Sequence, residues 1–192
     1  MLNRWEESLN EKVCAFDIDG VLNYYPQPWV DFLNQWLDTT FADLTEAKDS
    51  IPYSKYRELK FEYRESGYKA KLQVREGAVE LTRRLKEKGY TILILTARPF
   101  HEHKSLFKQT IDWLNIGDIR YDGIIFGRDK HIQVLDRAPS TRFIIEDHRY
   151  YANLVAKWGY RTFLLDNRYN RGPLLKNVVR INKLLEVISY GV

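Results

Sequence analysis

The sequence predicts an α/β fold with a central parallel sheet flanked by helices and a small helical segment inserted after the first strand. Short apolar runs rich in β-branched residues alternate with longer segments whose apolar residues recur at helical spacing. Such alternation favours βαβ units and a parallel sheet covered on both faces. One long aromatic-rich region interrupts the alternation, and the 192 residues suffice for a core domain plus one small insertion.

Five apolar runs have the length of strands and end at turn or polar residues. They are residues 13–18, 90–95, 123–126, 142–145 and 161–165. Helices are expected between and after them, because apolar residues there recur every three to four positions. The expected helices are residues 76–88, 105–114, 150–158 and 174–188. Gly89 and Gly159 directly follow two of these segments, which is a typical signal for the C-terminal end of a helix.

The region from residue 24 to residue 74 contains no convincing strand. Helices are predicted at 29–37 and 53–66, and eleven of the chain's 27 aromatic residues fall in this region. A loop of this length is unusual in a compact domain unless it folds by itself or serves a function. We therefore predict a helical cap at 24–74, inserted into an α/β core formed by 1–23 and 75–192.

The composition indicates a packed core and only a mild positive charge. The chain is 44% hydrophobic and has a formal net charge of +4. This charge suits an anionic substrate. The chain has no long run of like charges, so the sequence gives no indication that it binds nucleic acid. The single cysteine, Cys14, excludes an intramolecular disulfide and a cysteine-based metal site. No signal peptide or membrane span is recognisable, so we expect a cytoplasmic protein.

Polar residues suited to phosphate chemistry follow the first two expected strands. Ligands of parallel α/β sheets bind beyond the carboxyl ends of the strands, so functional residues are expected there. Asp17 and Asp19 come at the end of the first strand, and Gly20 allows a sharp turn after them. Thr96, followed by Ala97, Arg98 and a proline, ends the second strand. Its hydroxyl and the neighbouring N–H groups could hold a phosphate at a helix start.

The next two strands end in charged residues. Lys130 follows the third strand, and the acids Glu146 and Asp147 follow the fourth. Clustered carboxylates need a cation to offset their repulsion, and Mg²⁺ prefers oxygen ligands. Histidine and cysteine ligands for a softer metal are absent from these positions. Each feature alone is a weak signal, since Asp-x-Asp also binds the metal of many nucleotide-sugar glycosyltransferases. Their joint placement at four strand ends favours phosphoryl chemistry.

At these positions the sequence resembles the haloacid dehalogenase (HAD) superfamily. Residues 17–22, Asp-Ile-Asp-Gly-Val-Leu, match its first motif, while Thr96 and Lys130 match the second and third. Glu146-Asp147 matches the acidic fourth motif, and the likeness extends from about residue 11 to residue 172. Within the superfamily the chain resembles the 5′(3′)-deoxyribonucleotidase-like branch. The stretches that carry this second likeness are residues 110–114, 121–124, 164–166 and 169–171.

The resemblance implies a Rossmann-like core and a role for each motif residue. Asp17 would be the nucleophile that forms an aspartyl-phosphate. Asp19 would protonate the leaving oxygen and then activate the hydrolytic water. Mg²⁺ would be held by the Asp17 carboxylate, the Asp19 backbone carbonyl and Asp147. The branch usually has two aspartates in the fourth motif, so Glu146 leaves the division of metal binding open.

The second and third motifs would bind the phosphoryl group. Thr96, the Ala97 N–H group and Lys130 would neutralise and orient it, because phosphoryl transfer depends on positioning and charge stabilisation. Arg98 is a further phosphate-binding candidate, with a structural ion pair as the alternative. Tyr24 or Tyr25 is expected to contact the substrate, since both closely follow the nucleophile loop.

The sequence also predicts where the four histidines lie. His101, His103 and His131 are expected at the surface, and His148 at the mouth of the site, directly after the acidic pair.

The sequence thus predicts a Mg²⁺-dependent phosphomonoester hydrolase, with a nucleoside monophosphate as the leading substrate. One alternative is a phosphatase for another small ester, such as a sugar phosphate, or for nucleic-acid ends. Another is a catalytically silent HAD-fold binding protein, although a binding module has no need to retain every acid. A glycosyltransferase would leave Thr96, Lys130 and Asp147 unexplained.

Overall fold

The computed structural model describes residues 12–192 and contains one six-stranded sheet in which every neighbouring pair is parallel. The strands are β1 (Lys12–Asp17), β2 (Tyr90–Thr96), β3 (Gly123–Phe126), β4 (Thr141–Glu146), β5 (Arg161–Leu165) and β6 (Val178–Ile181). Their order is β3-β2-β1-β4-β5-β6. The chain builds outward in one direction from β1 and in the other from β4, so the crevice between these two strands is the expected ligand site.

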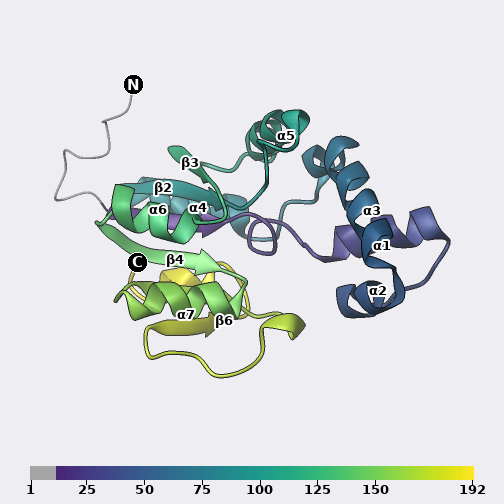
Figure 1. Ribbon diagram of the computed structural model, residues 1–192. Helices are drawn as coiled ribbons and strands as arrows, with labels where there is room; N and C mark the ends of the chain where they lie inside the picture. Colours follow the sequence, from purple (N-terminus) through teal and green to yellow (C-terminus); the bar gives the residue numbers. More distant parts are fainter. Residues whose placement is uncertain (1–11) are drawn as a thin grey trace.

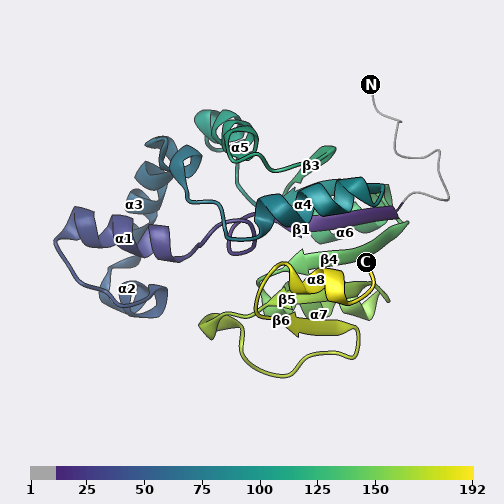
Figure 2. The same cartoon turned by 180° about the vertical axis from the view of Figure 1, so that it is seen from behind.

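Helices cover both faces of the sheet (Figures 1 and 2). One face carries α4 (Ala78–Glu87), α5 (Lys104–Ile116) and α8 (Glu186–Ser189), and the other carries α6 (Lys130–Arg137) and α7 (Arg149–Lys157). Because both faces are covered, β1 reads as an almost continuous apolar run rather than an alternating one. The predicted α/β fold with a parallel sheet flanked by helices is confirmed.

Residues between β1 and α4 form helices that stand beyond the carboxyl end of β1 (Figure 1). They are α1 (Gln27–Leu37), α2 (Leu44–Ser50), α3 (Tyr53–Glu65) and the 3₁₀ helix η1 (Tyr68–Lys71). These helices bury an apolar cluster of their own, in which the Trp29 ring lies 5.6 Å from Phe32 and 5.0 Å from Tyr63. We call this segment the cap; its proposed boundaries, 24 and 74, stay a prediction.

The chain leaves the core and returns to it through adjacent segments. Asn23 and Val74 form an isolated antiparallel bridge, and the Arg75 N–H donates to the Leu22 carbonyl at 2.8 Å. The cap is therefore tied to the loop after β1 at both of its connections. None of the helices within residues 12–192 is both long and apolar enough to cross a membrane.

The prediction of one long helix at 174–188 is wrong. The structure has the edge strand β6 and the short helix α8 instead, and β6 pairs with β5 from Val178 to Ile181. β-branched residues at 178, 179 and 181 favour a strand, while the apolar spacing of the whole stretch also fits a helix. Pairing with β5 decided between them, since it satisfies backbone groups that a strand edge leaves free.

Two further helices, α2 and α6, were not predicted because each is short. The helix after β2 begins at Lys104, one residue before the predicted start at 105. No helix begins directly after Thr96, where Pro99 disfavours helical conformation at the residue before it. The N–H groups near Thr96 therefore belong to a loop and not to a helix N-terminus.

Candidate active site

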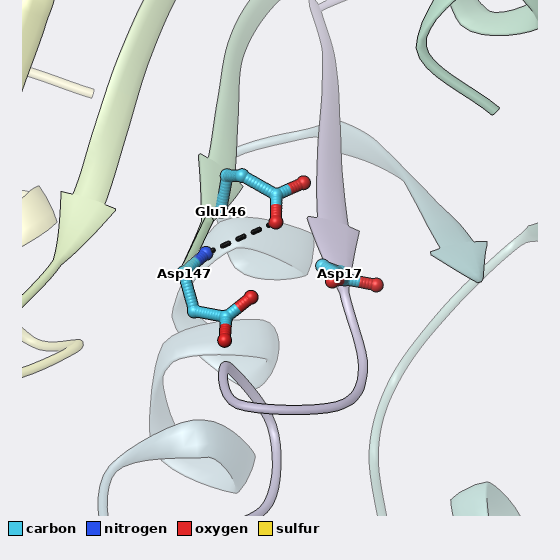
Figure 3. Close-up of side chains that lie close together, drawn as sticks. All are labelled: Asp17, Glu146 and Asp147. Atoms are coloured by element: carbon cyan, nitrogen blue, oxygen red, sulfur yellow. Dashed lines mark hydrogen bonds between the residues drawn. The ribbon is translucent and has the colours of Figure 1, made fainter. Parts of the chain in front are cut away.

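Three buried carboxylates meet at the carboxyl ends of β1 and β4, the two strands between which the sheet order reverses (Figure 3). Asp17 ends β1, while Glu146 ends β4 and Asp147 follows it. Each offers one oxygen, and these oxygens all lie within 4.8 Å of one another. The sequence separates the two strands by more than a hundred residues, and parallel pairing of β1 with β4 brings their ends together.

Lys130, the first residue of α6, faces this cluster. Its Nζ lies 2.5 Å from Asp17 Oδ1 and 3.6 Å from Glu146 Oε2, and its side chain is buried. Burial acts to lower the pKa of Lys130, but the attraction of Asp17 and Glu146 prevails and raises it. The ammonium group therefore stays charged, as a phosphate-binding lysine requires.

The pKa values of the three acids are shifted in different directions by this environment. Burial raises the pKa of Asp17 to about 7 against the attraction of Lys130, and Glu146 adds repulsion. Burial also raises the pKa of Asp147, with further repulsion from Glu146 and Asp17. Glu146 is the exception, because Lys130 and His131 outweigh its burial and lower its pKa. Three carboxylates thus share one lysine, and ionising all three would leave a surplus of negative charge in a buried place.

This donor set fits a divalent cation of the Mg²⁺ type. All three groups are hard oxygen ligands, and a divalent ion would offset the surplus charge. Asp147 is held on its other side, because the Tyr169 hydroxyl donates to its Oδ2 and Asn170 Nδ2 donates to its backbone carbonyl at 2.8 Å. Gly20 has φ +95°, and a Cβ there would lie 2.0 Å from Asp147 Oδ2, so only glycine lets the two segments approach this closely.

The Asp19 carboxylate is not a member of this cluster. Arg98 donates to it from Nη2 at 2.8 Å and from Nε at 3.2 Å, and Lys69 of η1 lies 2.7 Å away. Asn23 Nδ2 adds a hydrogen bond of 2.9 Å. Although burial acts to raise it, the pKa of Asp19 is held well below its usual range by Arg98 and Lys69. In this arrangement Asp19 is a charged carboxylate that links the core to the cap.

Two cavities meet beside the cluster. The larger has a volume of about 540 Å³, and the smaller, of about 160 Å³, extends under α3 of the cap. Both are lined by Asp17, Asp19, Tyr25, Ala97 and Lys130. The end of β2 therefore contributes to the same place as the ends of β1 and β4.

The other predicted phosphate-binding residues lie on the smaller cavity. Thr96 lines it from the end of β2, and its Oγ1 accepts a hydrogen bond from the Arg98 N–H at 3.2 Å. The Arg98 guanidinium also lines it but is engaged by Asp19 and by Thr110 Oγ1. The ion-pair alternative thus describes Arg98 in this structure, and its contact with phosphate stays a prediction.

The chain is similar in sequence to known nucleotidases. Residues 11–189 match the model of the family described as 5′ nucleotidase, deoxy (pyrimidine), cytosolic type C protein. A nucleotidase of Clostridium acetobutylicum is 29% identical over 197 residues, which cover 97% of this chain and 94% of the relative.

The chain belongs to this nucleotidase family. It is a HAD-type phosphatase of the nucleotidase type, as its motifs predicted. Solved structures of low sequence identity share the fold. A haloacid dehalogenase-like hydrolase of Streptococcus pneumoniae has a TM-score of 0.64 at 18% identity, covering 94% of this chain and 98% of its own. The D,D-heptose 1,7-bisphosphate phosphatase of B. bronchiseptica, complexed with magnesium and phosphate, has a TM-score of 0.58 at 13% identity, with 93% and 97% covered.

Of the two tyrosines expected to meet substrate in this nucleotidase, Tyr25 lines both cavities and Tyr24 lines neither. The Tyr24 hydroxyl accepts a hydrogen bond from the Glu76 N–H at 3.1 Å, and its ring lies 4.5 Å from the Arg75 guanidinium carbon. Tyr24 therefore fastens the cap connections, and a substrate contact is kept as a proposal for Tyr25 alone.

The expectation that His103 and His131 lie at the surface is wrong. Both are buried, because each has an acidic partner: His103 Nδ1 lies 2.7 Å from Glu65 Oε1, and His131 Nε2 lies 2.8 Å from Glu146 Oε2. His131 thus contacts the acidic cluster through Glu146 and helps to hold that side chain in place. His148, predicted to lie at the mouth of the site, lines the larger cavity.

Sequence reasoning missed three cap residues beside the carboxylate cluster. Lys60, Arg64 and Lys69 line the smaller cavity. They occur among many charged residues of the cap, and charged residues on a helix normally face water. The one available signal was the spacing of Lys60 and Arg64, since residues four apart share a helix face.

Proposed function

We propose that this enzyme hydrolyses phosphomonoesters with Mg²⁺ through an aspartyl-phosphate on Asp17. One observation carries the proposal: Asp17, Glu146 and Asp147 converge at the point where the sheet order reverses, with Lys130 beside them. Bound there by Asp17, Asp147 and the Asp19 carbonyl, the cation would neutralise phosphate oxygens and orient the phosphoryl group. Glu146, held by Lys130 and His131, would serve the cation through an outer contact.

The chain's own residues divide the reaction between them. An Asp17 oxygen attacks phosphorus, the ester oxygen leaves, and Lys130 with Thr96 and the Ala97 N–H group stabilises the charge on the phosphoryl oxygens. Asp19 donates a proton to the leaving oxygen and later accepts one from the water that attacks the aspartyl-phosphate. Its ion pairs with Lys69 and Arg98 have to loosen before Asp19 carries that proton, because they favour its charged form.

A nucleoside monophosphate is the substrate that we propose first. The family and the Clostridium relative are nucleotidases, and Tyr25 offers an aromatic ring at the cavity where a base or sugar could pack. The cytosolic type named in the family description supports a cytoplasmic location. The complete set of acids and Lys130 speaks against a silent binding protein, since burying them without a function would only cost stability.

A phosphate-release assay with nucleotides, sugar phosphates and a 5′-phosphorylated oligonucleotide tests the proposal, each with Mg²⁺ and with EDTA. We expect hydrolysis only with Mg²⁺, and we expect Asp17→Asn to abolish it without unfolding the protein. Asp31→Asn, on the exposed face of α1, is the matched control and should behave as wild type. Acid-quenched wild type should carry hydroxylamine-labile phosphate. Full turnover by Asp17→Asn would refute the nucleophile, and nucleotides as the poorest substrates would refute the nucleotidase assignment.

A further inference from the structure

The smaller cavity has a basic wall supplied by the cap. Lys60 and Arg64, four residues apart on α3, line it together with Lys69 of η1. The core side of the same cavity is formed by Asp17, Thr96 and other residues of the phosphoryl site. Cationic side chains of the cap therefore face the reacting group across one continuous space.

Two of the cations around this space already share a carboxylate partner. Asp19 pairs with both Lys69 and Arg98. Lys60 and Arg64 differ, because no carboxylate within residues 12–192 lies within 4.0 Å of either charged group. The side-chain nitrogen atoms of this pair therefore have no acidic partner among the described residues and can donate to an anionic ligand.

The contacts of these two residues hold them in place without balancing their charge. Lys60 Nζ lies 3.4 Å from the Tyr25 hydroxyl and 4.1 Å from the Trp29 ring centroid. Arg64 Nη1 lies 3.4 Å from His103 Nε2, and the Arg64 backbone carbonyl accepts a hydrogen bond from Gln109 of α5 at 2.9 Å. This bond fixes the position of α3 against the core.

Without a ligand, the pair of Lys60 and Arg64 destabilises the folded protein. Like charges four residues apart on a helix repel each other. Burial, together with the charges of Lys69 and Arg64, lowers the pKa of Lys60, which means that its charged form is destabilised. The rings of Trp29 and Tyr63 offset part of the cost of placing the Lys60 ammonium group here, because they attract cations. They do not explain why Arg64 lies at the same cavity. An anionic ligand would account for both.

We propose that Lys60 and Arg64 bind a second phosphate group of the substrate, so that the enzyme prefers phosphomonoesters that carry another phosphate. The inference rests on the proposed phosphatase function and extends its substrates from monophosphates to phosphomonoesters that carry a second phosphate, which it makes the preferred ones. Arginine and lysine on one helix face provide several donors for phosphate oxygens. The cavity of about 160 Å³ far exceeds the space that a single water needs, roughly 10–15 Å³.

The larger cavity leaves room for the organic part of such a substrate. It opens from the same residues, Asp17, Ala97 and Lys130, and its wall includes Tyr151 and Tyr169. One phosphate at Asp17 and one at the cap would thus place a nucleoside or sugar at the junction of the two cavities. Both a nucleoside bisphosphate and a sugar bisphosphate share the chemistry that the cap cations recognise.

Steady-state kinetics with matched substrate pairs test this proposal. The pairs are thymidine 3′,5′-bisphosphate against thymidine 5′-monophosphate, and fructose 1,6-bisphosphate against fructose 6-phosphate. We expect kcat/KM to be roughly tenfold or more higher for the bisphosphate of at least one pair, the effect of a charge-assisted hydrogen bond. The pair that shows the preference identifies a nucleotide or a sugar source.

Variants of α3 assign the preference to the cap. In Lys60→Gln and Arg64→Gln the ratio of kcat/KM between bisphosphate and monophosphate should fall toward one. Lys55→Gln and Arg57→Gln remove the same charges from the same helix at positions that do not line the cavity, and they should keep the wild-type ratio. A ratio near one in wild type, or a ratio that Lys60→Gln and Arg64→Gln leave unchanged, overturns the inference while the phosphatase function stands.

Binding measurements separate the two proposals. If neither pair is hydrolysed, the proposed function fails, and the melting temperature of wild type with each compound decides the cap site. A larger rise with thymidine 3′,5′-bisphosphate than with the monophosphate, lost in Arg64→Gln, supports the second phosphate site. Equal rises, or a difference that persists in Arg64→Gln, refute it.

Discussion

Gly20→Ala is the sharpest test of how the carboxylate cluster of Asp17, Glu146 and Asp147 is built. Gly20 has φ +95°, and an added Cβ would lie 2.0 Å from Asp147 Oδ2 and 2.9 Å from the Tyr169 hydroxyl oxygen. Two effects follow. The left-handed backbone costs an alanine about 1–2 kcal/mol, and the Asp147 carboxylate has to move away from Asp17 and Glu146.

The first effect is a matter of stability and the second of metal binding. For a chain of this size, about 1–2 kcal/mol corresponds to a fall in melting temperature of roughly 2–8 °C. Displacing one of three clustered carboxylates should weaken Mg²⁺ binding by roughly tenfold or more. Even the loss of a residue that only holds a metal ligand in place typically lowers metal affinity by this factor. Hydrolysis at limiting Mg²⁺ should fall with it.

Gly159→Ala is the matched control. Gly159 has φ +89°, but nothing lies within 4 Å of an added Cβ, so it carries the backbone cost without the clash. Thermal melts over a Mg²⁺ titration, with hydrolysis measured in the same buffers, compare the two variants. If Gly20→Ala keeps the Mg²⁺ midpoint and the activity of Gly159→Ala, the close approach of Gly20 and Asp147 is not what positions the ligand.

Two further predictions concern the buried Lys130 and the half-buried Lys60. Lys130→Met leaves Asp17 and Glu146 without their buried cation, so unfolding measurements without Mg²⁺ should show a loss of about 3–5 kcal/mol; a loss below about 1 kcal/mol would show that the pair contributes little. Lys60→Met should raise the melting temperature at pH 7, because the folded protein binds the Lys60 proton less tightly than the unfolded chain does. This penalty disappears as pH rises past the unfolded pKa of about 10.4, so the advantage of Lys60→Met should shrink between pH 7 and 10; a constant gap would point to packing instead.

Much of the core site was predictable because it follows from the rules of parallel sheets. Asp17, Thr96 and Glu146 each end an apolar strand, and parallel strands bring their carboxyl ends to one edge of the sheet. The sequence could therefore place these residues together without any coordinates. The same local rules misjudged residues 174–188, because a strand of four residues and a helix share the available apolar positions.

The cap shows where sequence reasoning stops. The pattern of the segment predicted helices and many aromatic contacts, but not which face of α3 would turn toward the core. Lys60 and Arg64 look like residues of a solvated face, and His103 and His131 like surface histidines. Lys60 and Arg64 are half-buried and the two histidines are buried, with partners such as Gln109, Glu65 and Glu146 that only the folded chain brings near.

The sequence by itself determined the fold class, the family motifs and the residues at the strand ends, since each depends on short-range periodicity and on the geometry common to parallel sheets. Only the tertiary structure decided that Asp19 is held by Lys69 and Arg98, that Tyr25 rather than Tyr24 lines the cavities, and that cations of the cap line the cavity beside Asp17. The physical reason is that charge pairing and burial depend on distances between segments far apart in the chain, which local patterns do not specify.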